Sequence, residues 1–128
     1  MNPAADSSWH QHKGQLFVEE RSIDGDGTPQ VLLHGFTQTS RSWDSYVALL
    51  DPSTPMLRVD MPGHGRSTHI RADLPATADL IATQCGLGDY IGYSMGGRVA
   101  LHVALQHPQC VRRLVLISAT AGIADPDE

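Results

Sequence analysis

The segment Gly92-Tyr-Ser-Met-Gly96 constrains the fold of this chain more than any other. Its G-x-S-x-G pattern follows a short apolar run and precedes apolar residues at helical spacing. In that context the pattern predicts a sharp strand-to-helix turn with Ser94 at its apex. The flanking glycines allow the backbone segments to approach each other without a Cβ clash. The first turn of the helix after Ser94 has free N–H groups that can donate to an oxyanion formed beside the serine. Ser94 is therefore predicted to be a nucleophile.

Short apolar runs alternate with helical patterns along the rest of the chain. Strands are predicted at residues 16–21, 30–33, 56–60, 89–92 and 111–118, and helices at 43–50, 68–88 and 95–107. We expect Ser40 or Ser42 to cap the first helix and the first two strands to form a hairpin. The alternation indicates an α/β fold, with a mostly parallel sheet flanked by helices. Residues 1–14 lack periodicity and are predicted to be a mobile leader before a single domain at 15–128.

Composition and charge argue against several classes of protein. The formal net charge is −5 and the nine basic residues are scattered, so no nucleic-acid partner is expected. No apolar run approaches the roughly 20 residues of a membrane span and no signal peptide is evident, which predicts a cytoplasmic protein with no membrane partner. Cys85 and Cys110 lack a metal-ligand spacing and indicate free thiols. His10 and His12 have no accompanying ligand cluster, so we expect neither a metal nor another cofactor.

Three distinctive loops follow predicted strands, directly after Leu33, Asp60 and Tyr93. The carboxyl ends of parallel strands meet at one edge of a sheet, and ligands of α/β proteins gather there. We therefore expect these three loops to converge on Ser94 and to form a site for a small-molecule substrate.

The same loops carry the motifs Leu33-His-Gly-Phe36, Asp60-Met-Pro-Gly-His-Gly-Arg-Ser67 and Gly92-Tyr-Ser-Met-Gly-Gly-Arg98. With these motifs in this order, the chain after about Gly14 resembles the N-terminal half of the α/β-hydrolase family. Within that superfamily it is most similar to the 2-succinyl-6-hydroxy-2,4-cyclohexadiene-1-carboxylate synthases of menaquinone biosynthesis. The resemblance implies an α/β-hydrolase-type sheet that is truncated after the strand following the nucleophile helix.

The resemblance also implies a role for each site residue. The implied site consists of the catalytic serine Ser94, the oxyanion-hole N–H groups of Phe36 and Met95, and the substrate-binding residues Arg98, Tyr93 and His34. A guanidinium one helical turn beyond the nucleophile suits a carboxylate-bearing substrate, although Arg98 could instead be a surface residue or form an internal salt bridge. For His34 the alternative to substrate binding is a structural role, in which the side chain positions its own loop.

A serine nucleophile needs a base, and that base needs an orienting acid. In this fold the order along the chain is serine, acid and histidine, but no histidine follows the acids Asp125, Asp127 and Glu128. The prediction is a serine enzyme for ester hydrolysis or pyruvate elimination that is inactive as this 128-residue chain. The alternative is a non-catalytic remnant or binding module that retains the fold. The apolar strand at 111–118 would leave an exposed edge through which chains could self-associate.

Overall fold

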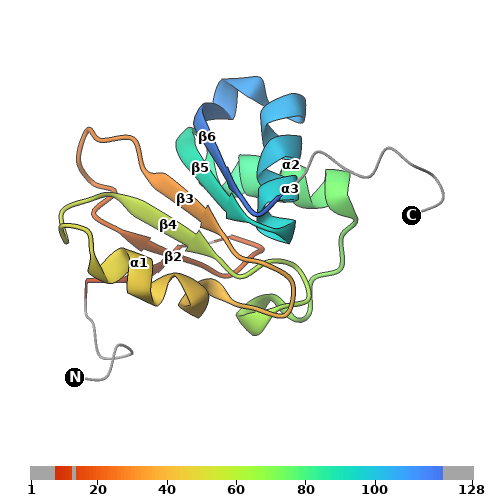
Figure 1. Ribbon diagram of the computed structural model, residues 1–128, viewed down its shortest axis with the longest axis horizontal. Helices are drawn as coiled ribbons and strands as arrows, with labels where there is room; N and C mark the ends of the chain where they lie inside the picture. The colour runs from red at the N-terminus through yellow and green to blue at the C-terminus, as the bar shows by residue number, and fades with distance from the viewer. Residues whose placement is uncertain (1–7, 13, 120–128) are drawn as a thin grey trace.

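The computed structural model describes residues 8–12 and 14–119, and in these ranges six strands form one sheet (Figure 1). The strand order is β1-β2-β4-β3-β5-β6. The strands are β1 (His10–His12), β2 (Val18–Arg21), β3 (Gln30–Leu33), β4 (Met56–Val59), β5 (Gly88–Tyr93) and β6 (Val111–Ile117). The helices are η2 (Ser40–Trp43), α1 (Asp44–Ala48), η3 (Gly65–Ser67), α2 (Leu74–Cys85), α3 (Met95–Gln106) and η4 (Pro108–Cys110), where η denotes a 3-10 helix.

The pairing of the strands confirms the predicted α/β class with a mostly parallel sheet. Strands β4, β3, β5 and β6 are parallel, and β1 and β2 are antiparallel additions at one edge. The predicted hairpin of the first two strands is wrong, because β2 pairs with β4, with Val18 opposite Val59, and β3 lies between β4 and β5. Three consecutive residues of β3 are buried, which suits a central strand covered on both faces.

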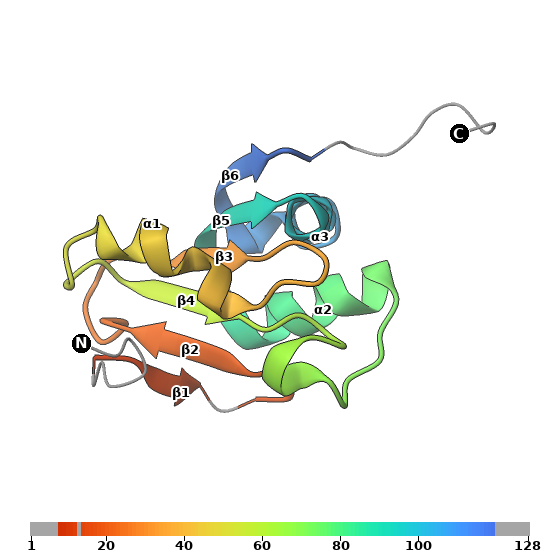
Figure 2. The same cartoon turned by 60° about the horizontal axis from the view of Figure 1, so that its bottom comes forward.

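Apolar side chains on the two faces of the sheet form two separate clusters. Leu32 packs with Trp43 and Val47 of η2 and α1. The neighbouring Val31 and Leu33 belong to a larger cluster that includes buried residues of α2 and α3. This division follows from the alternation of side chains along a strand. Figure 2 shows α1 on one side of the sheet and α2 on the other. The larger cluster therefore anchors α3, the helix that follows the candidate nucleophile.

Helix α2 is shorter than the predicted helix at residues 68–88, and its two ends have different causes. The carboxylate of Asp73 accepts a hydrogen bond from the Ala76 N–H at 2.9 Å, which caps the start of the helix. Gly86 follows the last turn with φ 66°, a conformation that glycine adopts at little cost. Residues 68–73 therefore remain outside the helix and connect it to η3.

The helical segment after β3 is capped by a different residue from the two predicted. Thr39 is the cap of η2, and its hydroxyl accepts a hydrogen bond from the Arg41 N–H at 3.2 Å. Neither Ser40 nor Ser42 caps this segment, because η2 already begins at Ser40. The predicted caps lie in the right segment, but Ser40 follows the actual cap by one residue and Ser42 by three.

The N-terminal segment differs from the leader predicted at residues 1–14. His10–His12 form β1, which pairs antiparallel with β2, and the His12 ring contacts the Glu20 carboxylate. Residues 1–7 and 13 lie outside the described residues. Across the part of the chain that the structure describes, no three His, Cys, Asp or Glu side chains are arranged to hold a metal ion. Within that same part, no helix has the length and apolarity required to cross a bilayer.

Strand β6 forms one edge of the sheet and pairs with β5 but with no other described strand. Three consecutive apolar residues of β6, Val115, Leu116 and Ile117, are 45%, 38% and 41% exposed. An unpaired apolar edge offers backbone N–H and C=O groups and apolar surface to a second strand. We propose that two chains associate through this edge.

Replacing Val115 with lysine is expected to weaken that association about tenfold, because a charge on an edge strand opposes strand addition. Sedimentation velocity over a range of protein concentrations measures the change. Leu105 on α3 is 70% exposed and provides a matched control, because Leu105→Lys adds the same charge away from the sheet edge. An equal loss of association in both variants would contradict a role for β6.

Candidate active site

Strand β5 and helix α3 meet at Ser94, which has φ 53° and ψ −112°. A residue other than glycine in such a conformation costs about 1–3 kcal/mol and persists only where its surroundings enforce it. A Cβ added to Gly92 would collide with the Gly96 carbonyl, and a Cβ added to Gly96 would lie 2.6 Å from the carbonyl oxygen of His34. The strand-to-helix turn predicted from the G-x-S-x-G pattern is confirmed, with Ser94 at its apex.

Backbone hydrogen bonds hold this turn on both sides. The Ser94 N–H donates to the Ile117 carbonyl of β6 at 2.9 Å. The Ser94 carbonyl accepts from the N–H groups of Gly97 and Arg98 at 3.0 and 3.1 Å, in the first turn of α3. The residue itself is half-buried. The backbone of Ser94 is thus fixed from two elements, while its side chain remains partly accessible.

Two backbone N–H groups near the turn make no hydrogen bond to any described residue, those of Phe36 and Met95. Met95 opens α3, and the first N–H groups of a helix have no partner within it. Phe36 lies in the loop after β3. That loop packs on the turn, since a Cβ added to Gly35 would lie 3.0 Å from the Tyr93 ring. Free N–H groups at such a place can donate to an oxygen that develops negative charge.

Two histidines connect the loop after β3 to the loop after β4. His34 donates from Nδ1 to the Gly35 carbonyl at 2.8 Å and accepts at Nε2 from the Met61 N–H at 3.0 Å. His64 donates from Nδ1 to the Pro62 carbonyl at 3.0 Å and accepts at Nε2 from the Thr37 N–H at 3.1 Å. The rings of the two histidines lie 5.2 Å apart, measured between centroids. Both nitrogens of each ring are therefore engaged, and neither histidine can accept the proton of a serine hydroxyl.

His34 was grouped with the substrate-binding residues, but its surroundings assign it to the positioning of its loop. The side chain is fully buried, and its ring bonds only to backbone atoms. Burial lowers the pKa of His34 from its ordinary value of 6.5, and the neighbouring His64 acts in the same direction. The neutral ring is the form that matches both hydrogen bonds, because one nitrogen donates and the other accepts.

The lowered pKa of His34 predicts a loss of stability in mild acid. The unfolded chain binds a proton at this residue more readily than the folded chain, so the stabilising contribution is complete above about pH 6.5 and falls below it. Below about pH 6.5 we therefore expect His34 to contribute a progressive loss in unfolding free energy. Urea denaturation at several pH values should give a flatter profile for His34→Asn than for the wild type. The exposed His69 provides the control His69→Asn. Parallel profiles for wild type and His34→Asn would contradict the assignment.

A buried carboxylate, Asp60, fixes the loop geometry; the sequence analysis placed it at a strand end and in a family motif but gave its side chain no role. Its Oδ1 accepts from the Ser40 N–H at 2.8 Å, and its Oδ2 accepts from the Arg66 N–H at 3.0 Å. Asp60 is 3% exposed. It therefore joins the start of η2 to η3 beneath the candidate site. The signal that could have revealed it is an acid placed directly after an apolar strand, since a buried carboxylate requires nearby donors.

The predicted substrate-binding residues line different cavities. Arg98 and Met95 line a cavity of about 260 Å³ together with Met61, Pro62, Ala72, Leu74, Thr77 and Val99. Tyr93 lines a second cavity, of about 300 Å³, with residues of η2 and α1 and with Ile117. Arg98 is exposed and forms no ion pair with a described residue. The structure therefore groups Arg98 with Met95 and separates both from Tyr93.

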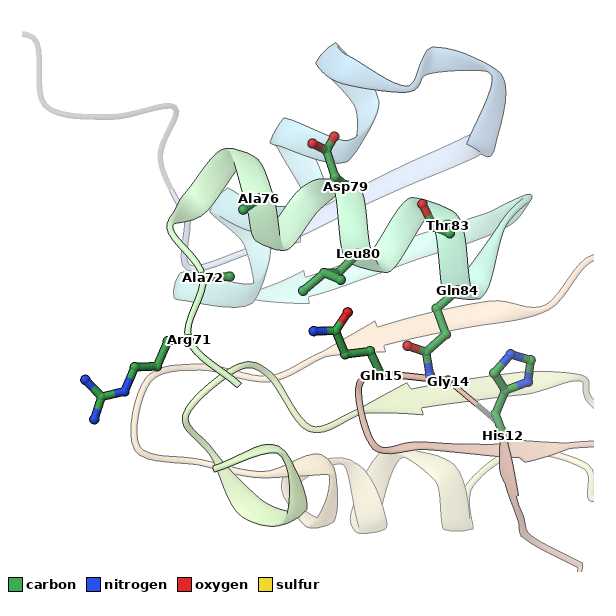
Figure 3. A pocket seen from close by; sticks show the side chains of 10 residues that line it. All are labelled: His12, Gly14, Gln15, Arg71, Ala72, Ala76, Asp79, Leu80, Thr83 and Gln84. Atoms are coloured by element: carbon green, nitrogen blue, oxygen red, sulfur yellow. The ribbon is translucent and has the colours of Figure 1, made fainter. Parts of the chain in front are cut away.

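A larger cavity, of about 580 Å³, lies between α2 and the segment before β2 (Figure 3). None of the predicted site residues lines it. Gln84, one of its lining residues, is occupied in a structural role. Its side chain accepts from the Leu16 N–H at 2.9 Å and donates to the Leu16 carbonyl at 2.7 Å. The size of this cavity alone therefore does not make it the functional site.

Comparison with known proteins identifies the family. A model described as the alpha/beta hydrolase family matches residues 30–128. The chain belongs to this family. Among similar proteins, the pimeloyl-(acyl-carrier protein) methyl ester esterase of Nitrosomonas europaea is 39% identical over 98 residues, covering 75% of this chain and 39% of that protein. The enzyme of the same name from Neisseria meningitidis serogroup B (strain MC58) is 38% identical over 112 residues, covering 84% of this chain and 43% of that protein.

Solved structures of alpha/beta hydrolases show the same arrangement. An esterase from a marine microorganism superposes with a TM-score of 0.74 at 26% identity, covering 91% of this chain and 46% of that one. A thermophilic esterase from Thermogutta terrifontis superposes with a TM-score of 0.72 at 26% identity, covering 88% of this chain and 44% of that one. The chain therefore spans less than half the length of each of these two esterases and of the two relatives above.

Proposed function

We propose that this chain supplies the nucleophile, the oxyanion donors and an acid-binding arginine of a carboxyl ester hydrolase. The observation that carries the proposal is the strained turn at Ser94, which lies near the backbone N–H groups of Phe36 and Met95. Neither N–H group has a hydrogen-bond acceptor among the described residues. Strain held at a single polar residue is typical of active sites. The names of the two esterase relatives support an ester as the substrate.

The chemistry would follow the usual course of acyl transfer. The Ser94 hydroxyl attacks the ester carbonyl and gives its proton to a base, and the carbonyl oxygen becomes an oxyanion that accepts from the Phe36 and Met95 N–H groups. Collapse of this intermediate expels the alcohol, which takes up a proton, and leaves an acyl-serine that water hydrolyses. His34 and His64 cannot be the base, because both nitrogens of each ring are engaged. We therefore expect Ser94 to react slowly in this chain alone.

Arg98 supports a substrate that carries a carboxylate besides its ester. Its guanidinium is exposed and lies beside a cavity whose other walls are mostly apolar. Arginine presents a planar pair of donors that matches a carboxylate. A short acyl chain across the apolar part of the cavity would join the ester at Ser94 to the carboxylate at Arg98. Replacing Arg98 with methionine should slow acylation of Ser94 by a carboxylate-bearing nitrophenyl ester more than acylation by nitrophenyl acetate.

Labelling of Ser94 by a fluorophosphonate, with and without free imidazole, tests the nucleophile assignment. Imidazole replaces the missing base, so we expect about tenfold faster labelling in its presence. Peptide mass spectrometry locates the adduct. Ser94→Ala should remove the adduct, whereas Ser118→Ala should not. Ser118 is a matched control because it also has a positive φ, 52°, and is exposed. Unchanged labelling of Ser94→Ala would reject the nucleophile, and fast labelling without imidazole would reject the expected lack of a base.

The second candidate function is pyruvate elimination, the reaction of the menaquinone synthases. Arg98 favours it, because a carboxylate-rich substrate also needs a guanidinium. Pyruvate release from the substrate of those synthases, followed by reduction with lactate dehydrogenase and NADH, distinguishes the two chemistries. A binding module without catalysis is the remaining candidate. It predicts that a carboxylate ligand binds at Arg98 while Ser94 gains no adduct even with imidazole.

A further inference from the structure

A further cavity lies on the α1 side of the sheet, near the amino end of β4, where Arg21 pairs with Met56. Its volume is about 290 Å³. Its walls include Trp9, Arg21, Val47, Leu50 and Arg58, and also Asp44, whose carboxylate is paired with Arg58 at 2.7 Å. This volume is at the small end of ligand pockets, which span roughly 300–1,000 Å³. Two arginines and a tryptophan around so small an apolar space distinguish this cavity from the others.

Arg21 lines the cavity as a buried cation without an acidic partner. The residue is 4% exposed, and no carboxylate of the described residues lies within 4.0 Å of its guanidinium. Among the described residues, its guanidinium makes two weak hydrogen bonds, to the Asp51 carbonyl at 3.4 Å and to the Met56 sulfur at 3.2 Å. Its Nε is buried and has no hydrogen-bond partner in the part of the chain that the structure describes. A guanidinium stays protonated in proteins, so this charge cannot be relieved by losing a proton.

The other two arginines on this face, Arg58 and Arg41, have acidic partners within 4.0 Å among the described residues, which Arg21 lacks. Arg58 contacts Asp44 at 2.7 Å and Glu19 at 3.6 Å, and Arg41 contacts the same two acids. Two carboxylates are thus shared by two arginines. The Asp51 carboxylate acts on Arg21 only from beyond ion-pair distance, so a ligand carboxylate would supply the close acidic partner that Arg21 lacks among the described residues.

The remaining walls indicate what else the ligand carries. The guanidinium carbons of Arg58 and Arg21 lie 3.9 and 5.0 Å from the centre of the Trp9 ring, so the ring is held by both cations. Val47 is buried, and Leu50 is half-buried on the same cluster. We infer that the cavity binds a small monocarboxylate with an apolar body, its carboxylate on the free Nε edge of Arg21 and its body against Trp9, Val47 and Leu50. This site does not depend on the function proposed for Ser94.

Binding of benzoate to the 128-residue chain tests this inference. Tryptophan fluorescence and the melting temperature are measured against increasing benzoate, benzamide and inorganic phosphate. Benzamide has the same shape as benzoate without the charge, and phosphate is an anion without the apolar body. We expect benzoate to raise the melting temperature and to bind at least tenfold more tightly than either comparison ligand. Equal affinity for benzoate and benzamide would overturn the role of Arg21, and equal affinity for benzoate and phosphate would overturn the apolar body.

The variant Arg21→Gln should weaken benzoate binding at least tenfold, whereas Arg71→Gln should leave it unchanged. Arg71 is an exposed arginine that lines a different cavity, and its replacement removes the same charge. Arg21→Gln breaks no ion pair of the described residues and should remain folded, which far-UV circular dichroism checks. Unchanged benzoate affinity in folded Arg21→Gln would overturn the site. If that variant did not fold, the comparison of benzoate with benzamide on the wild type would still decide, because it needs no substitution.

Discussion

Replacing Gly96 with alanine is expected to destabilise the fold by about 3 kcal/mol or more. The new Cβ would enter the space of the Leu33 carbonyl and lie 2.6 Å from the His34 carbonyl oxygen, and both are backbone atoms at the end of β3. Backbone atoms cannot move aside as a flexible side chain would, so α3 must separate from β3. Because Ser94 sits where β5 meets α3, the same separation should disturb the nucleophile.

Urea denaturation of Gly96→Ala measures this loss as a lower midpoint of unfolding. Gly25→Ala is the matched control, because no atom lies within 4 Å of a Cβ added to Gly25. We expect this control to change the unfolding free energy by less than about 0.5 kcal/mol. Similar midpoints for the two variants would show that the close approach of α3 to β3 is not required.

Replacing Asp60 with alanine should destabilise the fold by about 3 kcal/mol. The substitution leaves the N–H groups of Ser40 and Arg66 without their carboxylate partner, and hydrogen bonds to a charged acceptor contribute about 1.5–3 kcal/mol each. Hydrogen exchange should accelerate at these two amides more than in β5. The loop after β3 would lose a tether, so fluorophosphonate labelling of Ser94 should fall as well.

Asp73→Ala provides a comparison for this prediction. Asp73 also accepts a backbone N–H, from Ala76 at 2.9 Å, but it is exposed and caps only one helix. Loss of such a cap costs about 1 kcal/mol. A loss for Asp60→Ala no larger than that for Asp73→Ala would contradict the role of Asp60 in joining η2 to η3.

Features set by neighbouring residues could be predicted from the sequence. The turn at Ser94 was recognised because its glycines lie within two residues of it, and the start of α3 follows from the same segment. Strand β3 was predicted at its correct bounds because its apolar run is continuous. The pairing of β2 could not be predicted in this way. Its partner β4 lies about 40 residues further along the chain, and the intervening β3 was the more obvious neighbour.

Contacts between distant residues determined the roles of several site residues. His34 has the same sequence context whether it faces a substrate or the interior, and only its bond to the Met61 N–H shows that it positions a loop. Tyr93 and Arg98 are five residues apart in sequence at the turn, yet they line different cavities because they belong to β5 and α3. The function of Asp60 was missed for the same reason, since both of its donors lie in other loops.

The sequence by itself determined the α/β class, the turn that presents Ser94 and the membership of the alpha/beta hydrolase family. These depend on local spacing, because glycine tolerance and side-chain alternation are properties of a few consecutive residues. Only the tertiary structure decided that β4 lies between β2 and β3, that both ring nitrogens of His34 are engaged, and that Arg21 is buried with no carboxylate within 4.0 Å among the described residues. Burial and hydrogen-bond partners arise from packing between segments far apart in the chain, and local spacing does not encode which segments meet.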